Sequence, residues 1–340
     1  MMKMNELLPR FSVPVFKGIA LTLVLALAAR LIAGLPFFAI MGQLVIAIML
    51  GMMWRAAVGV DNGLLEGASY SSKKLLRLGI ILLGFRLNLY DIYNAGATVF
   101  FIAFANLTFA LLVVYGLSRL FKVEKRLGIL TACGTAICGA AAVVAIAPVI
   151  KANEKETAVG AANVAVLGTI FTILYTLIFS YLGLNALDYG VFAGGTLHEI
   201  AHVVAAADPA GQAALDLAII VKLTRVALLV PVAILIGILI KRKETGATGE
   251  KMTFASLPIP WFILGFLAVS AFNTTGLVSE GAASAIVSFA YLLIGMAMAG
   301  LGLNVDFKSF RQMGGKALTA GLAGSVLLSG FGYLLVRLFY

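Results

Sequence analysis

Arg86, Lys222 and Arg225 are basic residues that lie inside long apolar stretches of the sequence. A charge in the core of a bilayer costs at least ~2.5 kcal/mol, so such residues usually have a functional partner. Lys222 and Arg225 are three positions apart and would share one face of a helix. Glu199 is the one acid clearly within an apolar stretch. The excess of bases predicts a small-oxyanion site, and a structural pairing of Glu199 with one base is the alternative.

Two Gly-Thr pairs add uncharged groups that suit an anion. Glycine lets the backbone approach closely, threonine supplies a hydroxyl, and a helix N-terminus at this point would aim free N–H groups at the ligand. Small residues there could instead serve close helix packing. Asn88 and Asn304 either cap helices or line the site. The predicted substrate-binding residues are Gly134, Thr135, Cys138, Gly195, Thr196, His198, Glu199, Lys222, Arg225, Arg86, Asn88 and Asn304.

The segment from His198 to His202 reads H-E-x-x-H, the pattern of zinc metalloproteases. It makes an intramembrane zinc protease the alternative function. Glycines precede His198, whereas the zinc motif needs a regular helix, and no third ligand is evident. We therefore expect no metal and no enzymatic activity. In a transporter, Glu199, His198 and His202 could instead exchange protons, and we assign them the coupling role as a hypothesis.

The elements that must position these residues are membrane-spanning helices. Of the 340 residues, 62% are hydrophobic and 12% charged, whereas a soluble domain has about a quarter charged. A spanning helix needs ~20 apolar residues. Nine stretches qualify: 18–35, 37–54, 75–94, 97–119, 157–182, 213–240, 259–274, 283–303 and 317–338. The net charge of +10 then reflects loop orientation rather than a nucleic-acid partner.

Two further apolar stretches, 127–150 and 188–209, are interrupted by Gly, Thr and polar residues. Cytoplasmic loops are rich in Lys and Arg. With a cytoplasmic N-terminus, all Lys and Arg residues but five fall on the cytoplasmic side, provided that both stretches enter and leave on one side. The five exceptions are Arg30, Arg86, Lys222, Arg225 and Arg337. We therefore expect two re-entrant hairpins or, equivalently, interrupted helices.

An internal repeat supports this arrangement. Residues 133–148 align without a gap on residues 194–209, with Gly-Thr, Val-Val and a closing Pro in register. A second pair matches over 36–94 and 260–308, including the ends at Asn88 and Asn304. The copies are permuted in order, and the number of spans between them makes them inverted. Inverted repeats with interrupted helices are typical of secondary transporters.

The stretches GTAICGAAAVVAIAPVI, GGTLHEIAHVVAAA and IIVKLTRVALLVPV together resemble the YeiH-type conserved membrane proteins, a family for which sulphate export is predicted. The likeness covers nearly the whole chain. It implies a bacterial inner-membrane transporter of about ten or more helices. Two positions depart from the family pattern: Gln is usual at His202, and Tyr-Pro at Tyr175-Thr176.

The sequence thus predicts an all-α polytopic membrane protein with about nine full spans and two hairpins, forming a single transmembrane domain over residues 1–340. We expect a secondary transporter that moves a small anion such as sulphate, sulphite or a sulphonate by alternating access. An anion channel is a further alternative. The expected surroundings are the lipid bilayer of the inner membrane, the expected assembly is a homodimer, and no cofactor is expected. The chain carries no P-loop motif.

Overall fold

The computed structural model describes residues 13–35, 38, 42–245, 261–304 and 307–340, and every regular element within these ranges is helical. The elements are α1 (Val13–Ala33), α2 (Gln43–Ala57), α3 (Asn62–Tyr70), η3 (Ser71–Leu75), α4 (Leu76–Leu82), η4 (Leu83–Arg86), α5 (Leu89–Asn94), α6 (Gly96–Leu120), α7 (Lys125–Ala136), α8 (Ala140–Ile146), α9 (Glu154–Ile178), η5 (Phe179–Tyr181), α10 (Ala186–Thr196), α11 (Ile200–Ala207), η6 (Asp208–Ala210), α12 (Gln212–Ala227), α13 (Leu229–Thr245), α14 (Trp261–Thr274), α15 (Glu280–Asn304) and α16 (Phe307–Phe339).

Six helical segments in the described part of the chain are long and apolar enough to cross a membrane: Pro14–Ala33, Gly96–Leu120, Glu154–Tyr181, Gln212–Lys241, Glu280–Asn304 and Met313–Phe339. They correspond to six of the nine predicted spans. Of the other three, 37–54 and 259–274 correspond to the shorter helices α2 and α14 and begin outside the described residues. The membrane character of the chain is therefore clear, while the count of nine spans stays a prediction.

The predicted span 75–94 has different bounds in the structure. The helix begins at Asn62, because the Asp61 side chain accepts a hydrogen bond from Leu64 N and caps it. It then runs through the π-helical segment η3 to Arg86, where the extended backbone of Leu87 ends it. Hydropathy placed the start too late because Ser71, Ser72 and two lysines lie inside this helix rather than before it.

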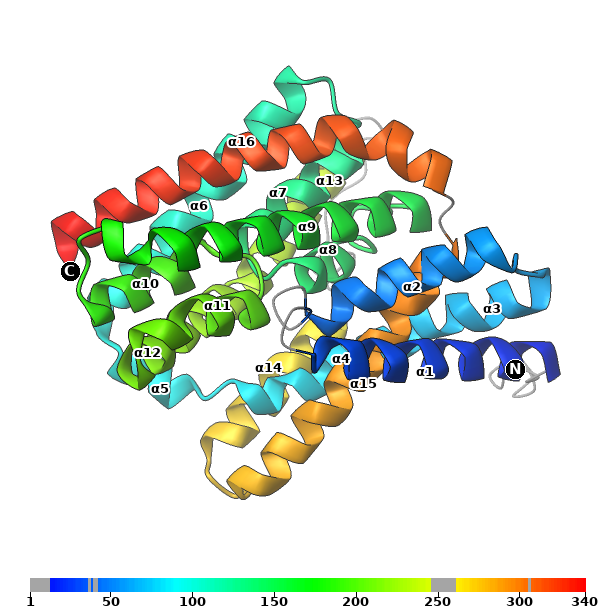
Figure 1. Ribbon diagram of the computed structural model, residues 1–340, viewed down its shortest axis with the longest axis horizontal. Coiled ribbons are helices and arrows are strands. Elements are labelled where there is room, and N and C mark those ends of the chain that lie inside the picture. The colour runs from blue at the N-terminus through cyan, green and yellow to red at the C-terminus, as the bar shows by residue number, and fades with distance from the viewer. Residues whose placement is uncertain (1–12, 36–37, 39–41, 246–260, 305–306) are drawn as a thin grey trace.

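The helices form two groups (Figure 1). α1, α2, α3 and α15 pack together, and α14 packs against α4 and η4. On the other side α6, α7, α9, α10, α12 and α16 contact one another. We call the first set the scaffold group and the second, with α8 and α11, the hairpin group. α8 and α11 lie toward the middle of the molecule in this view.

The two interrupted stretches are hairpins. α7 runs alongside α9 in the same direction, since Leu127 lies near Gly160 and Gly134 lies near Val164. The chain can join two parallel neighbours through the short α8 only by reversing, and Val143 of α8 lies back against Gly134. α10 and α12 are parallel in the same way, with α11 as the return arm.

Glycine sets the distance between α2 and α15 in the scaffold group. A Cβ on Gly302 would lie 2.2 Å from the carbonyl oxygen of Ile48, and a Cβ on Gly51 would lie 2.4 Å from that of Ala299. Both contacts are with backbone, which cannot move aside as a side chain can. Small residues at such positions let membrane helices approach closely and gain van der Waals contact.

We expect Gly302→Leu to destabilise the protein by about 1–3 kcal/mol through overpacking, measured as a lower Tm of the purified protein in detergent. Gly330→Leu on α16 is the matched control, because a Cβ there meets no atom within 4 Å. Equal Tm values for the two variants would contradict this account of the α2–α15 contact.

Candidate functional site

The tips of the two hairpins meet inside the protein. Residues 137–139 interrupt the first hairpin and residues 197–199 the second. Glu199 Oε1 accepts a hydrogen bond of 3.0 Å from Ala140 N, the first amide of α8. The Glu199 side chain packs on Gly139, where a Cβ would lie 2.3 Å from Glu199 Cγ. Gly139 has a φ of 72°, so it needs glycine for both its conformation and its close contact.

Arg225 of α12 joins the two hairpins. Its Nε and Nη2 donate to the carbonyl of Ala136, and Nη2 also donates to that of Thr135 at 2.9 Å. Its Nη1 donates to the carbonyls of Gly195 at 2.7 Å and Leu197 at 3.2 Å. A guanidinium has five N–H donors. Carbonyls at the ends of α7 and α10 therefore engage all of them.

Lys222, one turn before Arg225, repeats this bridge. Its Nζ donates to the carbonyl of Ile137 at 2.6 Å and to that of Leu197 at 2.7 Å. Both side chains are fully buried. An ammonium has three N–H donors. Two of those of Lys222 bond to the carbonyls, and one is left for another acceptor.

The backbone of the hairpins explains why Lys222 and Arg225 lie at the tips. α7 and α10 both end at the tips, and the last carbonyls of a helix lack intrahelical partners and carry partial negative charge. Without water, those carbonyls need donors from elsewhere. Lys222 and Arg225 supply the donors, and the paired carbonyls in turn stabilise the buried charges. As their three-residue spacing predicts, Lys222 and Arg225 lie on one face of α12, and that face is toward the tips.

The predicted Gly-Thr residues contribute mostly to packing and to the backbone. A Cβ on Gly134 would lie 2.7 Å from Val143, and one on Gly195 would lie 2.9 Å from Asn106 Nδ2. The Thr196 hydroxyl donates to Phe192 O and accepts from Tyr175 Oη at 2.9 Å. The buried Thr135 hydroxyl has no hydrogen-bond partner among the described residues. Cys138 is buried in the turn of the first hairpin.

The H-E-x-x-H segment does not form the helical zinc motif. His198 lies in the interruption before α11, with Nε2 3.2 Å from Ser325 Oγ of α16. His202 lies within α11 against Gly168 of α9. The two imidazoles therefore do not stand one helical turn apart, and the described residues contain no cluster of three or more His, Cys, Asp or Glu suited to a metal ion. This geometry does not favour the metalloprotease alternative.

Arg86 and Asn88 line a cavity of about 610 Å³. We call it the outer cavity; it is formed mainly by η4, the end of α14 and the first turns of α15. The Arg86 guanidinium carbon lies 5.9 Å from the centre of the Tyr291 ring. Asn88 Oδ1 accepts from Tyr90 N at 2.9 Å, so Asn88 both caps α5 and lines the cavity.

Asn304 lies far from this site. It ends α15, where its Nδ2 donates to Gly300 O at 3.0 Å and to Ser69 Oγ at 3.4 Å. Tyr291 is 13 residues earlier on the same helix, which corresponds to about 20 Å at the rise of an α-helix. The structure therefore does not bring Asn304 to the hairpin tips.

Tyr291, Gln43 and Asn106 adjoin the tips and were not anticipated. Tyr291 interacts electrostatically with Arg86 and Glu199. Gln43 Nε2 donates a hydrogen bond of 3.1 Å to the backbone carbonyl of Tyr291. Asn106 is fully buried beside Gly195, and neither of its amide atoms has a partner in the described ranges. The sequence did offer a signal for Asn106, because it is a polar residue within an apolar stretch. Tyr291 carries no such signal, because aromatic residues are common in these helices.

The buried hairpins and long apolar helices define the class as a multi-pass α-helical membrane protein. The family profile described as Conserved hypothetical protein 698 matches residues 17–321. The chain is 63% identical to a UPF0324 membrane protein of Bacillus cereus, over 94% of each chain. It is 55% identical to one of Oceanobacillus iheyensis over 94% of each, and 35% identical to one of Staphylococcus aureus over 95% of this chain and 96% of the relative.

The chain thus belongs to the UPF0324 family of membrane proteins. The predicted resemblance to the YeiH-type conserved membrane proteins is confirmed.

We expect Arg225→Lys to destabilise the protein although it keeps the charge. Lysine lacks the planar fork that reaches both hairpins, and each carbonyl left without a donor costs about 1–3 kcal/mol. Thermal unfolding in detergent measures the effect. Arg30→Lys, at an exposed position on α1, is the control. An unchanged Tm in Arg225→Lys would show that the carbonyl contacts do not hold the hairpins together.

Proposed function

We propose that this protein is a secondary transporter that moves a small oxyanion, such as sulphate, sulphite or a sulphonate, across the plasma membrane by alternating access. The observation that carries the proposal is the meeting of two interrupted hairpins around two buried cations and one carboxylate. Non-helical backbone at membrane depth is tolerated only where it is buried in protein or lines a water-filled cavity.

We propose a different role for each of the three bases, based on its contacts. Arg225 has its donors on carbonyls, so it acts on the anion through its charge alone. Lys222 offers its remaining N–H, and it interacts electrostatically with Cys138 and His198. Arg86 lines the outer cavity beside Tyr291 and would supply a fork of donors to the anion. The anion would bind between the tips and Arg86.

Two cavities lie toward opposite ends of α15. The outer cavity includes Glu280, Ala283 and Val287. A smaller one, of about 150 Å³, includes Leu301 and is called the inner cavity below. The two share no lining residue. This arrangement supports alternating access, in which the hairpin group moves against the scaffold group so that one cavity at a time reaches the tips.

The packing also supports the inverted repeat. α2 contacts α15 closely, and α14 contacts α4 and η4, so each proposed repeat pairs its first helix with the second helix of the other. The interruptions at 137–139 and 197–199 agree with the alignment of the two hairpins to within about one residue, which is the usual uncertainty of helix ends.

The sidedness follows from charge. Lys73 Nζ lies 2.6 Å from Glu154 Oε1, and Arg55 Nη1 donates to Leu303 O, so several Lys- and Arg-rich segments gather at one end. We assign that end to the cytoplasm, together with the N-terminus. A homodimer would give the moving hairpin group a fixed support, and we retain it as part of the proposal.

We expect purified protein in liposomes to take up sulphate or methanesulphonate saturably and to show counterflow, which a channel does not show. Arg86→Gln should raise KM about 10- to 100-fold, because a charge-assisted hydrogen bond contributes about 1.5–3 kcal/mol, while Tm stays unchanged. Lys222→Ala should abolish uptake. Arg30→Gln serves as the control. Uptake that never saturates would favour the channel, and no uptake or stabilisation by any small oxyanion would refute the proposal.

Glu199 is the candidate for proton coupling, since it is the carboxylate at the tips. We expect an imposed pH gradient to change uptake by the wild type but not by Glu199→Gln. The glutamine oxygen can still accept from Ala140 N, so the fold and counterflow should persist. Wild-type uptake that ignores the gradient would rule out coupling to protons at this residue.

A further inference from the structure

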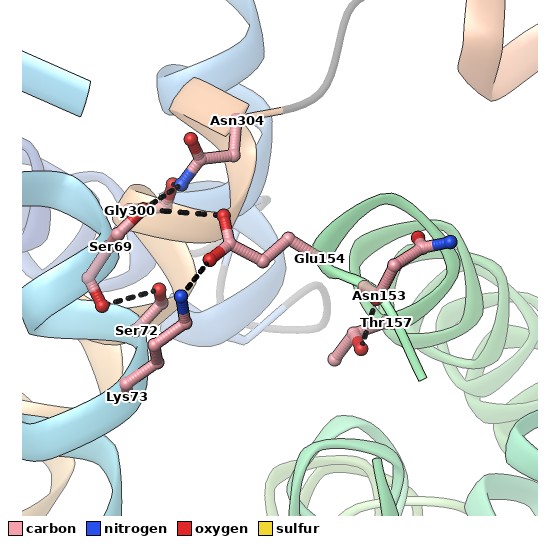
Figure 2. Close-up of polar contacts among 8 residues, drawn as sticks. All are labelled: Ser69, Ser72, Lys73, Asn153, Glu154, Thr157, Gly300 and Asn304. Carbon is pink, nitrogen blue, oxygen red and sulfur yellow. Dashed lines mark hydrogen bonds and ion pairs between the residues drawn. The ribbon is translucent and has the colours of Figure 1, made fainter. Parts of the chain in front are cut away.

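A polar cluster connects the hairpin group to the scaffold group at the inner end of the molecule (Figure 2). Glu154, the first residue of α9, lies between Lys73 and Ser69. Its Oε1 is 2.6 Å from Lys73 Nζ, and its Oε2 accepts from Ser69 Oγ at 3.3 Å. Asn304 donates to the same serine at 3.4 Å. One carboxylate thus links α9 directly to η3 and α3, and through Ser69 to Asn304 at the end of α15.

The inner cavity lies directly behind this cluster. Its wall includes Lys73, Arg77, Glu154 and the nearly buried Thr157, together with Val144 and Pro148 at the end of the first hairpin. The cavity lies between the two helix groups, and the return arm of the first hairpin forms part of its wall. Its two bases exceed its one acid, as at the tips.

Lys73 lies in η3, the π-helical stretch within the long helix from Asn62 to Arg86. Single π-helical turns occur frequently at functional sites. The Lys73 side chain is 59% exposed and that of Glu154 30%. An ion pair this exposed shifts an equilibrium by no more than about fivefold, so it can open readily when another anion competes for Lys73.

We propose that the inner cavity is a second subsite for the transported oxyanion, in which the anion replaces Glu154 as the partner of Lys73. This inference rests on the proposed function. While no anion is present, Glu154 pairs with Lys73 and closes the cavity between the two helix groups. When the anion arrives from the tips, it takes the ammonium of Lys73 with Arg77 beside it and fills the space in front of Thr157.

The test measures access to the cavity through a cysteine at Thr157, in the purified full-length protein. The modification rate of Thr157→Cys by a water-soluble maleimide is recorded as the increment over the parent protein, whose Cys133 and Cys138 are buried. Sulphate and methanesulphonate are the probes, and sodium chloride at equal ionic strength controls for screening.

We expect the oxyanions to slow modification of Thr157→Cys, and Lys73→Gln to abolish this protection. Glu154→Gln should raise the rate without oxyanion and lower the half-protecting concentration about fivefold, the limit for an exposed ion pair. Lys74→Gln, at the adjacent exposed lysine, is the matched control and should leave both values unchanged.

Protection that persists in Lys73→Gln, or a rate that Glu154→Gln does not change, would overturn the subsite. The subsite is equally overturned if an oxyanion stabilises the wild type and enters liposomes yet never protects Thr157→Cys. That result would leave the transport proposal standing. Absence of both uptake and stabilisation would refute the transport proposal and the subsite together.

Discussion

The contact between two buried cations and the carbonyls of two hairpin tips is the constraint on which the rest of the structure depends. α7 and α10 end inside an apolar protein, where each unpaired carbonyl would cost free energy. Arg225 and Lys222 reach carbonyls of both hairpins from one helix. Moving either hairpin separately would leave donors and acceptors unpaired. α7, α10 and α12 are therefore expected to behave as one unit.

The same contacts limit what the cations can do for a ligand. A guanidinium whose five donors are all on backbone carbonyls cannot also form a bidentate pair with an oxyanion. Its charge still acts at short range in a medium of low polarity. Hydrogen bonds to the anion itself would then come from Lys222 and from groups outside the hairpins. Arg86, which lines the outer cavity, is one of these groups. A site divided between two helix groups responds to their relative movement.

The contacts within the scaffold group differ in kind from some of the contacts between the two groups. Within the scaffold group, α2 and α15 approach through glycine against backbone, which leaves little freedom. Between the groups, the inner end is joined by an exposed ion pair and hydrogen bonds around Glu154, which are individually weak. The groups also share buried apolar contacts, in which α9 packs against α2 and α15. The polar contacts around Glu154 are the part of this interface that a competing ion can weaken.

The sequence by itself determined the membrane character, the two interrupted stretches and the charged residues that lie inside apolar stretches. These properties are local: hydropathy and helix-breaking residues are read within a window of about 20 positions. It also placed Lys222 and Arg225 on one helix face. The partners of those cations lie 25 to 90 residues away along the chain, and the sequence offers no signal for backbone carbonyls as partners.

Only the tertiary structure showed that Glu199 bonds to the first amide of α8, that Tyr291 stands beside Arg86, and that Asn304 lies about 20 Å from Tyr291 along α15. It also moved the start of the third long helix to Asn62, where the Asp61 cap outweighs the polar residues that follow. The physical reason is common to all of these. A local pattern reveals how a segment is solvated and how its backbone tends to fold, whereas the identity of a buried partner depends on which distant segment packs against it.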